Sequence, residues 1–184
     1  MLLELGDRYW ALGLPAAARS ALQRALAQTS DAAPALRLTD IALAQGDAPA
    51  ARAFAAEANK RAPGPATKIL LGRAQLLAGE LGAARMSLSV ALDSPKLTAW
   101  DRARAHLERS RLADAQSDAQ GAAAQAAAAF EAAITAAQKT APELPLVEEI
   151  AAAVVAHGRA ADAMASLDTV RGQPGAHVCA AALL

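Results

Sequence analysis

The sequence predicts an all-α chain in which about five helical hairpins stack into one α-solenoid. Its composition favours helix, because alanine, leucine and arginine are abundant while aromatic residues make up only 3% of the chain. Glycine recurs at a fixed period, since Gly13, Gly46 and Gly79 lie 33 residues apart. An alanine follows five residues after each of these glycines, at Ala18, Ala51 and Ala84. Fixed periods of this length indicate a stacked array, because one hairpin cannot bury its own apolar face.

Residues 5–26 set the pattern of a hairpin. Leu5, Tyr9 and Leu12 recur at helical spacing and predict one buried face of a first helix. Gly13 is expected to end this helix, where a residue that adopts positive φ is needed. Pro15 suits the first turn of the second helix. The buried stripe of that second helix is predicted at Ala18, Leu22, Ala25 and Leu26.

Proline, glycine and helix-capping residues mark where the later hairpins begin and end. Asp31 and Pro34 start the second hairpin, and Pro63-Gly64-Pro65 separates it from the third. Thr98 and Asp101, which open the fourth, have nearly the spacing of a capping box. The hairpins are accordingly predicted at residues 1–30, 31–63, 64–94, 97–140 and 143–173, and a further helix begins at 176–184.

The fourth hairpin departs from the period of 33. Its second helix is predicted to carry Ala126, Phe130, Ala133 and Ile134, which places the turn at Gly121. The extra residues imply a longer first helix, from Trp100 to about Gln116, together with a longer loop over 117–121. The fifth hairpin has the same spacing of glycine, alanine and leucine as the first, at Gly158, Ala163 and Leu167.

These repeated residues resemble the tetratricopeptide repeat (TPR), whose pattern is W-x2-L-G-x2-Y, then A-x3-F, then P. The first copy matches it with Leu5-Gly6-x2-Tyr9 and Ala18-x3-Leu22, although the tryptophan of the pattern is absent. The third copy matches with Leu71-Gly72 and Ala84-x3-Leu88. The resemblance implies a right-handed α-solenoid over residues 1–184, which acts as a protein–protein interaction scaffold.

Charge and motif content argue against several other functions. Lysine plus arginine and aspartate plus glutamate number 18 each, so the chain lacks the basic excess that nucleic-acid binding requires. Its three histidines have no zinc-binding spacing, and there is no glycine-rich phosphate loop and no G-x-S-x-G motif. His177 and Cys179 would point in different directions on a helix. We therefore expect no catalytic activity, no metal and no cofactor.

Sequence features leave the compartment open. The apolar run 119–137 is mostly alanine and contains polar residues, so we expect a packed helix rather than a membrane span. A single cysteine, Cys179, excludes an internal disulfide framework. No signal peptide is visible. The chain would be cytoplasmic as written, or periplasmic if an upstream signal sequence had been removed.

A basic run lies in the first helix of the fourth hairpin. It consists of Arg102, Arg104, Arg109 and Arg111, interleaved with Asp101, Glu108 and Asp114. Oppositely charged pairs three residues apart favour a solvated, salt-bridged helix face. The alternative is a patch for an acidic segment of a partner.

Candidate binding residues follow from the TPR resemblance, which implies that the first helix of each hairpin lines a concave groove. The candidates are the first-helix residues that are not part of the repeat pattern itself. They are Asp7, Trp10, Arg37, Asp40, Leu43, Ile69, Arg73 and Leu76. Together they would suit an extended or helical peptide with apolar anchors and a carboxylate. The alternative is that Leu43, Ile69 and Leu76 pack between repeats. The Lys/Asn set with which some TPR domains hold a C-terminal carboxylate is absent.

Three further interpretations stay open beside a groove-binding scaffold. One is an enzyme subunit, whose catalytic domain would have to lie elsewhere in a longer chain. Ala/Leu/Arg-rich repeats of this length look like those of bacterial envelope and exopolysaccharide-export proteins, where the array would be a periplasmic spacer and docking segment. The pattern also begins and stops partway through a hairpin. This favours a piece of a longer array or a module that self-associates through its repeat ends.

Overall fold

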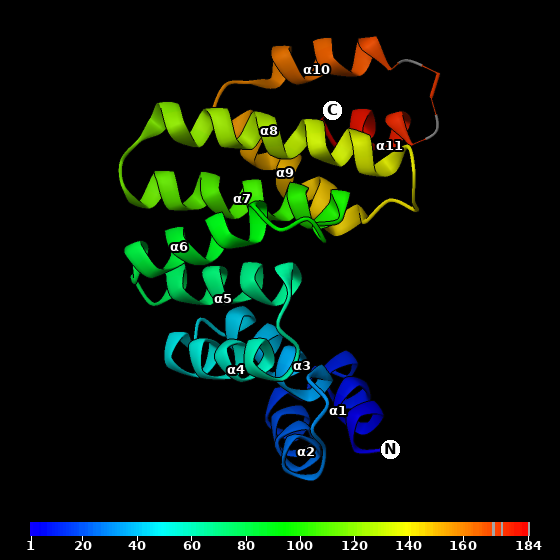
Figure 1. The fold of residues 1–184 in the computed structure, drawn as a ribbon. Helices are drawn as coiled ribbons and strands as arrows, with labels where there is room; N and C mark the ends of the chain where they lie inside the picture. The colour runs from blue at the N-terminus through cyan, green and yellow to red at the C-terminus, as the bar shows by residue number, and fades with distance from the viewer. Residues whose placement is uncertain (171, 174, 184) are drawn as a thin grey trace. The chain divides into compact units, whose positions relative to one another are not determined.

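The computed structural model describes residues 1–170, 172–173 and 175–183, and these form eleven α-helices and no strand (Figure 1). Two compact units are present, Met1–Val90 and Ala91–Leu184. The helices are α1 (Leu2–Ala11), α2 (Pro15–Gln28), α3 (Ala33–Ala44), α4 (Ala48–Arg61), α5 (Pro65–Leu77), α6 (Leu81–Leu92), α7 (Ala99–Ala115), α8 (Ala119–Ala137), α9 (Leu144–Ala156), α10 (Ala160–Thr169) and α11 (Ala176–Leu183). The all-α prediction is confirmed. Among the helices of this described part, none is both long and apolar enough to cross a membrane.

Three glycine turns close the hairpins of the first unit. Gly13, Gly46 and Gly79 have φ values of 69°, 67° and 74°, which is the left-handed conformation that glycine adopts without a steric penalty. The amide that follows each glycine donates a hydrogen bond to a carbonyl five residues earlier. These bonds run from Leu14 to Tyr9, from Asp47 to Ala42 and from Glu80 to Gln75, each at 2.9 Å. The three glycines therefore occupy equivalent corners, as the period of 33 predicts.

The turn of the fourth hairpin lies at Ser117 and not at Gly121. Ser117 has φ 60°, and Asp118 N donates to Ala113 O at 2.9 Å, as at the glycine corners. Asp118 then caps α8, since its Oδ1 accepts from Gly121 N at 2.9 Å, so Gly121 is already helical. The predicted turn and long loop are wrong, while the longer first helix is confirmed by α7.

Counting from the turn residue identifies one matched pair of buried positions in each hairpin. The first member lies seven residues before the turn and the second lies nine residues after it. The pairs are Gly6/Leu22, Thr39/Ala55, Gly72/Leu88, Ser110/Ala126 and Ala151/Leu167. A Cβ on Gly6 would lie 2.5 Å from Leu22 Cγ, and one on Gly72 would lie 2.8 Å from Leu88 Cγ. Leucine thus fills the space beside glycine or alanine, and alanine stands opposite a threonine or serine.

The two hydroxyl-bearing members of these pairs are satisfied inside their hairpins. Thr39 Oγ1 donates to Ala35 O at 2.8 Å, and Ser110 Oγ donates to Ala122 O at 2.9 Å. A buried hydroxyl without such a partner would be destabilising. Thr39 and Ser110 therefore fill part of the space that leucine fills in the other hairpins, and their hydroxyl groups are hydrogen-bonded.

One core cluster of the first unit lies between α1, α2 and α3, and a second, alanine-rich cluster lies between α3, α4 and α5. The second-helix stripe is confirmed, since Leu22 is completely buried and packs with Leu38 and Ile41. The first-helix stripe is only partly right, because Leu5 and Leu12 are 38% and 71% exposed. Leu12 lies beyond the last residue of α1, so it no longer follows the helical face.

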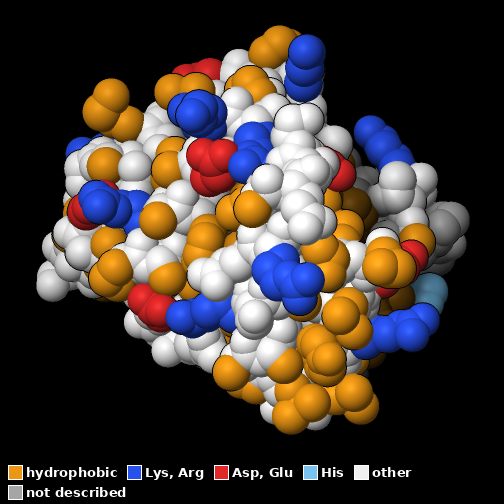
Figure 2. All heavy atoms as spheres, turned by 90° about the horizontal axis from the view of Figure 1, so that it is seen from below, with side chains coloured by type: hydrophobic (Ala, Val, Ile, Leu, Met, Phe, Trp, Pro, Cys, Tyr) orange, Lys and Arg blue, Asp and Glu red, His pale blue; other side chains and the backbone are white. Residues whose placement is uncertain are grey.

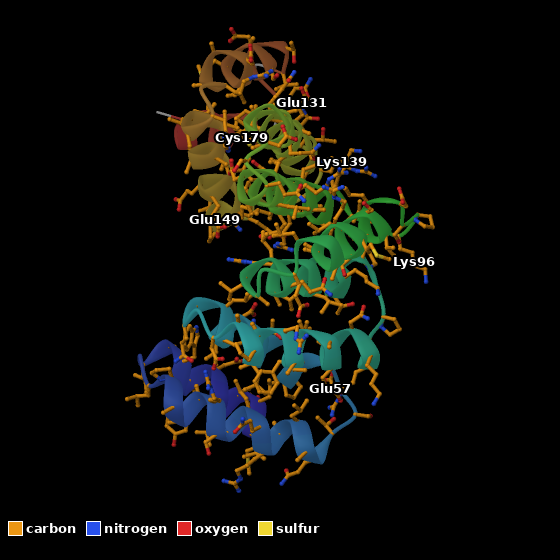
Figure 3. All side chains as sticks on the ribbon, turned by 90° about the vertical axis from the view of Figure 1, so that its left-hand side faces the viewer. Glu57, Lys96, Glu131, Lys139, Glu149 and Cys179 are labelled. Atoms are coloured by element: carbon orange, nitrogen blue, oxygen red, sulfur yellow. The ribbon has the colours of Figure 1, made fainter. Side chains whose placement is uncertain are left out.

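Arg61, the last residue of α4, ties that helix to the end of α2. Its guanidinium donates to Thr29 O at 2.6 Å, to Leu26 O at 3.2 Å and to Asp31 O at 3.1 Å. Its Nε donates to Glu57 Oε1 at 2.6 Å, and Figure 3 shows Glu57 on the same helix. This hydrogen bond from Arg61 is the main cause that lowers the pKa of the Glu57 carboxyl.

The core of the second unit is built around α8. Phe130 of α8 is 1% exposed and belongs to the same cluster as Trp100, Val147, Ile150 and many alanines. The indole of Trp100 donates to Thr140 Oγ1 at 2.8 Å, which satisfies its polar atom. Cys179 of α11 is completely buried in this cluster (Figure 3), and burial raises the pKa of its thiol.

We expect His106 to make the second unit less stable in mild acid. Its Nδ1 lies 2.9 Å from Gln125 Oε1. Burial lowers the pKa of His106, and this outweighs the hydrogen bond with Gln125, which raises it. Around and below the ordinary histidine pKa of about 6.5, the unfolded chain therefore binds more protons than the folded chain does. The stability that neutral His106 contributes is present above that pH and is lost as the pH falls through the lowered pKa.

Urea unfolding of the wild type at about pH 7.5 and about pH 5.5 would measure this loss. The His106→Gln variant is expected to lose less stability between the two pH values. His177→Gln, which alters an exposed histidine, serves as the matched control and should keep the wild-type dependence. An identical pH dependence in His106→Gln and the wild type would contradict the expectation.

Candidate functional site

A groove with a volume of about 320 Å³ opens on the first unit between α1 and α3, above α2. Four of the eight predicted binding residues line it, two from α1 and two from α3. Its lining residues are Asp7, Trp10, Leu22, Arg37, Asp40 and Ile41. Residues 30 or more apart in sequence therefore meet here, because successive first helices lie against each other.

An arginine between two aspartates forms the charged part of this groove. Arg37 Nε lies 3.2 Å from Asp7 Oδ1, and Arg37 Nη1 lies 3.9 Å from Asp40 Oδ2. The side chains of Arg37, Asp7 and Asp40 are 57%, 45% and 54% exposed. Exposed ion pairs contribute little stability, about 0–1 kcal/mol each. The three charges therefore stay accessible to a partner, while the Asp7–Arg37 pair joins one hairpin to the next.

The apolar part of the groove consists of Trp10 above a buried floor. The Trp10 residue is 41% exposed, whereas Leu22 and Ile41 are 0% and 2% exposed. Trp10 lies three residues before the turn glycine, on the last turn of α1. A large, half-exposed aromatic residue beside accessible charges is the composition typical of protein-binding hot spots.

The other four predicted residues lie outside this groove. Leu43 and Leu76 are half-buried and occupy the same place as Trp10, three residues before Gly46 and Gly79. Arg73 is also half-buried and makes an interaction of its own. Ile69 is 1% exposed, so the prediction that it contacts a partner is wrong. For Ile69 the alternative of packing within the array is correct.

An ion pair at the same register recurs in the second unit, where the sequence had not indicated one. Arg111 Nη2 lies 2.6 Å from Glu149 Oε2. Arg111 precedes its turn residue by six positions, as Asp7 does, and Glu149 precedes its own by nine, as Arg37 does. The pair is thus equivalent to Asp7–Arg37 with its polarity reversed. When positions are counted from Ser117 as the turn residue, Arg111 falls at the same register as Asp7. When they are counted from the predicted turn, Gly121, it does not.

Two arginines of the basic run on α7, Arg104 and Arg111, are paired with acidic groups, as predicted. Arg104 lies 3.5 Å from Asp101 and 2.5 Å from Glu143, and Arg111 lies 2.6 Å from Glu108. Burial alone would lower the pKa of Arg111, but its acidic neighbours raise it. Glu108 is 1% exposed, so this face is less solvated than the sequence suggested.

A serine, a histidine and an aspartate meet between α7 and the end of α9. His157 Nε2 lies 3.5 Å from Ser110 Oγ and 3.3 Å from Asp114 Oδ2. Both contacts fall on the same ring nitrogen, whereas a catalytic triad needs serine and aspartate on opposite nitrogens. Ser110 is also buried and donates its hydroxyl to Ala122 O. This arrangement therefore does not activate the serine.

The face drawn in Figure 2 carries mixed charge, and no metal cluster is found in the part of the chain that is described. Figure 2 shows acidic and basic side chains beside one another, with hydrophobic side chains exposed between them. Within residues 1–170, 172–173 and 175–183, no three His, Cys, Asp or Glu side chains are placed to hold a metal ion. The groove on the first unit combines exposed apolar and charged side chains.

Comparisons with known proteins bear on the fold. No family model matches the chain, and no curated protein matches it. Among solved structures, it is similar to the crystal structure of a thermophilic TPR protein from Thermus thermophilus. The TM-score is 0.64, with 21% sequence identity, over 99% of this chain and 97% of that chain. The fold of the chain is thus a TPR-like helical repeat.

Proposed function

We propose that this chain is a non-catalytic scaffold that binds a segment of a protein partner in the groove between α1 and α3. The observation that carries the proposal is Trp10, which is 41% exposed over a buried apolar floor in that groove. Covering a tryptophan of this kind removes a large apolar area from water and is a common source of binding energy.

The neighbouring first helices extend the same surface. Leu43 and Leu76 stand at the register of Trp10, and α1 contacts α3, which in turn contacts α5. A partner segment that crosses these helices would meet an apolar residue on each of them. Because helix packing holds the groove in shape, the groove loses little conformational entropy when a partner binds.

The proposal is tested by selecting random peptides from a displayed library on the whole chain and measuring their affinity for variants. Trp10→Ala is expected to weaken binding about 30-fold or more, which corresponds to a loss of about 2 kcal/mol at a hot spot. The far-UV circular dichroism of the variant should stay that of a helical protein, because Trp10 is not part of the core.

Met86→Ala supplies a matched control, since Met86 of α6 is a large apolar residue that is 71% exposed and does not line the groove. It should leave the affinity unchanged. If the selected peptides bind Trp10→Ala and the wild type equally, or if Met86→Ala weakens binding as much, the groove is not the binding surface.

A further inference from the structure

An apolar row crosses the first helices of the first unit, with one residue from each hairpin. Its members are Trp10, Leu43 and Leu76, and each precedes the turn glycine of its hairpin by three positions. Trp10 is 41% exposed and the two leucines are half-buried, so each keeps part of its surface open to solvent. All three lie in the unit Met1–Val90, where α1 contacts α3 and α3 contacts α5.

The spacing of this apolar row follows from helix packing. The axes of packed helices lie about 8–10 Å apart. Because the three residues occupy the same position in successive hairpins, neighbouring members of the row are separated by about the same distance. A partner segment that uses the whole row must therefore carry apolar side chains along one face at steps of about 8–10 Å.

A β-strand cannot supply that step, whereas an α-helix can. Side chains on one face of a strand recur every second residue, at about 6.6–6.8 Å, and the one after that is about 13 Å away. In an α-helix, residues seven positions apart return to nearly the same face after two turns, about 10.5 Å along the axis. A helix that crosses the row at a moderate angle shortens this step to about 8–10 Å.

The partner's backbone decides between a helix and polyproline II structure, whose three-residue step of about 9.3 Å would also fit the row. The turn glycine of each hairpin donates its amide to the carbonyl of the row residue, at 3.0 or 3.1 Å, so these carbonyls already have a donor. A polyproline II segment has no internal hydrogen bonds, and its peptide groups would lose water against the row without gaining a partner. A helix satisfies its own peptide groups.

We propose that the partner segment is an amphipathic α-helix that lies across α1, α3 and α5. Its apolar anchors are spaced seven positions apart and pack on Trp10, Leu43 and Leu76. The anchor at Trp10 enters the groove of about 320 Å³, whose buried floor is Leu22 and Ile41. This inference rests on the proposed function and adds the conformation and the residue spacing of the partner to it.

The first test changes only the peptide. Peptides of about 20 residues, which can hold three anchors seven apart, are selected on the whole chain, and the tightest one that needs Trp10 is scanned. Alanine should weaken binding about tenfold or more only at the anchors, and the anchors should lie seven positions apart. Proline between two anchors should weaken binding about 100-fold, because it breaks a helix. Alanine at the same position is the matched control and should change the affinity less than about threefold.

Double-mutant cycles between peptide and protein assign each anchor to its helix. When one anchor lies on Trp10, an anchor seven positions away should lie on Leu43. Replacing that second anchor by alanine and introducing Leu43→Ala should together weaken binding by less than the product of their separate effects. The same peptide change combined with Trp10→Ala is the crossed control, and its effects should multiply. Circular dichroism of each protein variant establishes that the helices are intact.

The outcomes separate this inference from the proposed function. Peptides that need Trp10 but tolerate proline between their anchors would overturn the helical partner and leave the proposed function standing. Anchors at another spacing, or a second anchor that is not coupled to Leu43, would overturn it in the same way. A selection that yields no Trp10-dependent peptide would overturn both. Proline-sensitive peptides whose anchors lie seven apart and couple to Trp10 and Leu43 would support both.

Discussion

Replacing Phe130 by alanine is expected to lower the free energy of unfolding of the second unit by about 3–5 kcal/mol. Phe130 is 1% exposed and lies on α8, which packs against α7, α9, α10 and α11. Most of its neighbours in the cluster on α8 itself are alanines. Alanine has no rotamer freedom with which to fill a cavity, so the upper part of this range is expected.

Denaturant unfolding followed by tryptophan fluorescence gives the measurement. The chain has two tryptophans, and Trp100 lies in the same cluster as Phe130. A Trp10→Phe background therefore makes the signal report on the second unit alone. Met164→Ala, at a 40% exposed position of α10, is the control and should cost no more than about 1 kcal/mol. If Phe130→Ala lowered the free energy of unfolding by no more than the control does, Phe130 would not be a main contributor to the core of the second unit.

The hairpins could be predicted because their corners and their second helices depend on local chemistry. A glycine with positive φ ends the first helix at Gly13, Gly46 and Gly79. Both members of the pattern that follows it, A-x3-L after Gly13 and Gly79 and A-x3-A after Gly46, are buried. The fourth corner escaped prediction because Ser117 adopts the left-handed conformation there. For a residue other than glycine this costs about 1–2 kcal/mol, so sequence patterns favour the wrong residue, Gly121.

The candidate site was predictable in part. The TPR resemblance named Asp7, Trp10, Arg37 and Asp40 from separate helices, and the structure brings these four into one groove. It could not tell an exposed apolar residue from a buried one on the same helix, as Ile69 illustrates. Nor could it show that Arg37 contacts two aspartates, because that contact depends on how one first helix packs against the next.

The two residues of each buried pair are matched in size. This predicts a second large effect on stability, for variants of the Gly72/Leu88 pair in the third hairpin. Leu88→Ala alone should cost about 2–5 kcal/mol, because it leaves a cavity beside Gly72. Gly72→Thr alone should cost about 1–3 kcal/mol or more, because a Cβ there would lie 2.8 Å from Leu88 Cγ. The double variant recreates the Thr39/Ala55 pair of the second hairpin. We expect it to be less destabilised than the sum of the single variants, by about 1–3 kcal/mol.

A deliberately mismatched double variant makes this expectation specific. Gly72→Thr combined with Leu22→Ala changes the same residue types, but Leu22 packs beside Gly6 and not beside Gly72. Its two costs should simply add, since the sites share no contact. If the matched and mismatched doubles were equally destabilised, the alternation of Gly/Leu with Thr/Ala would be incidental. If only the matched double recovers stability, then the fixed distance between first and second helix, rather than any one residue, is what the repeat preserves. In that case the groove can vary its exposed side chains while its helices keep their spacing.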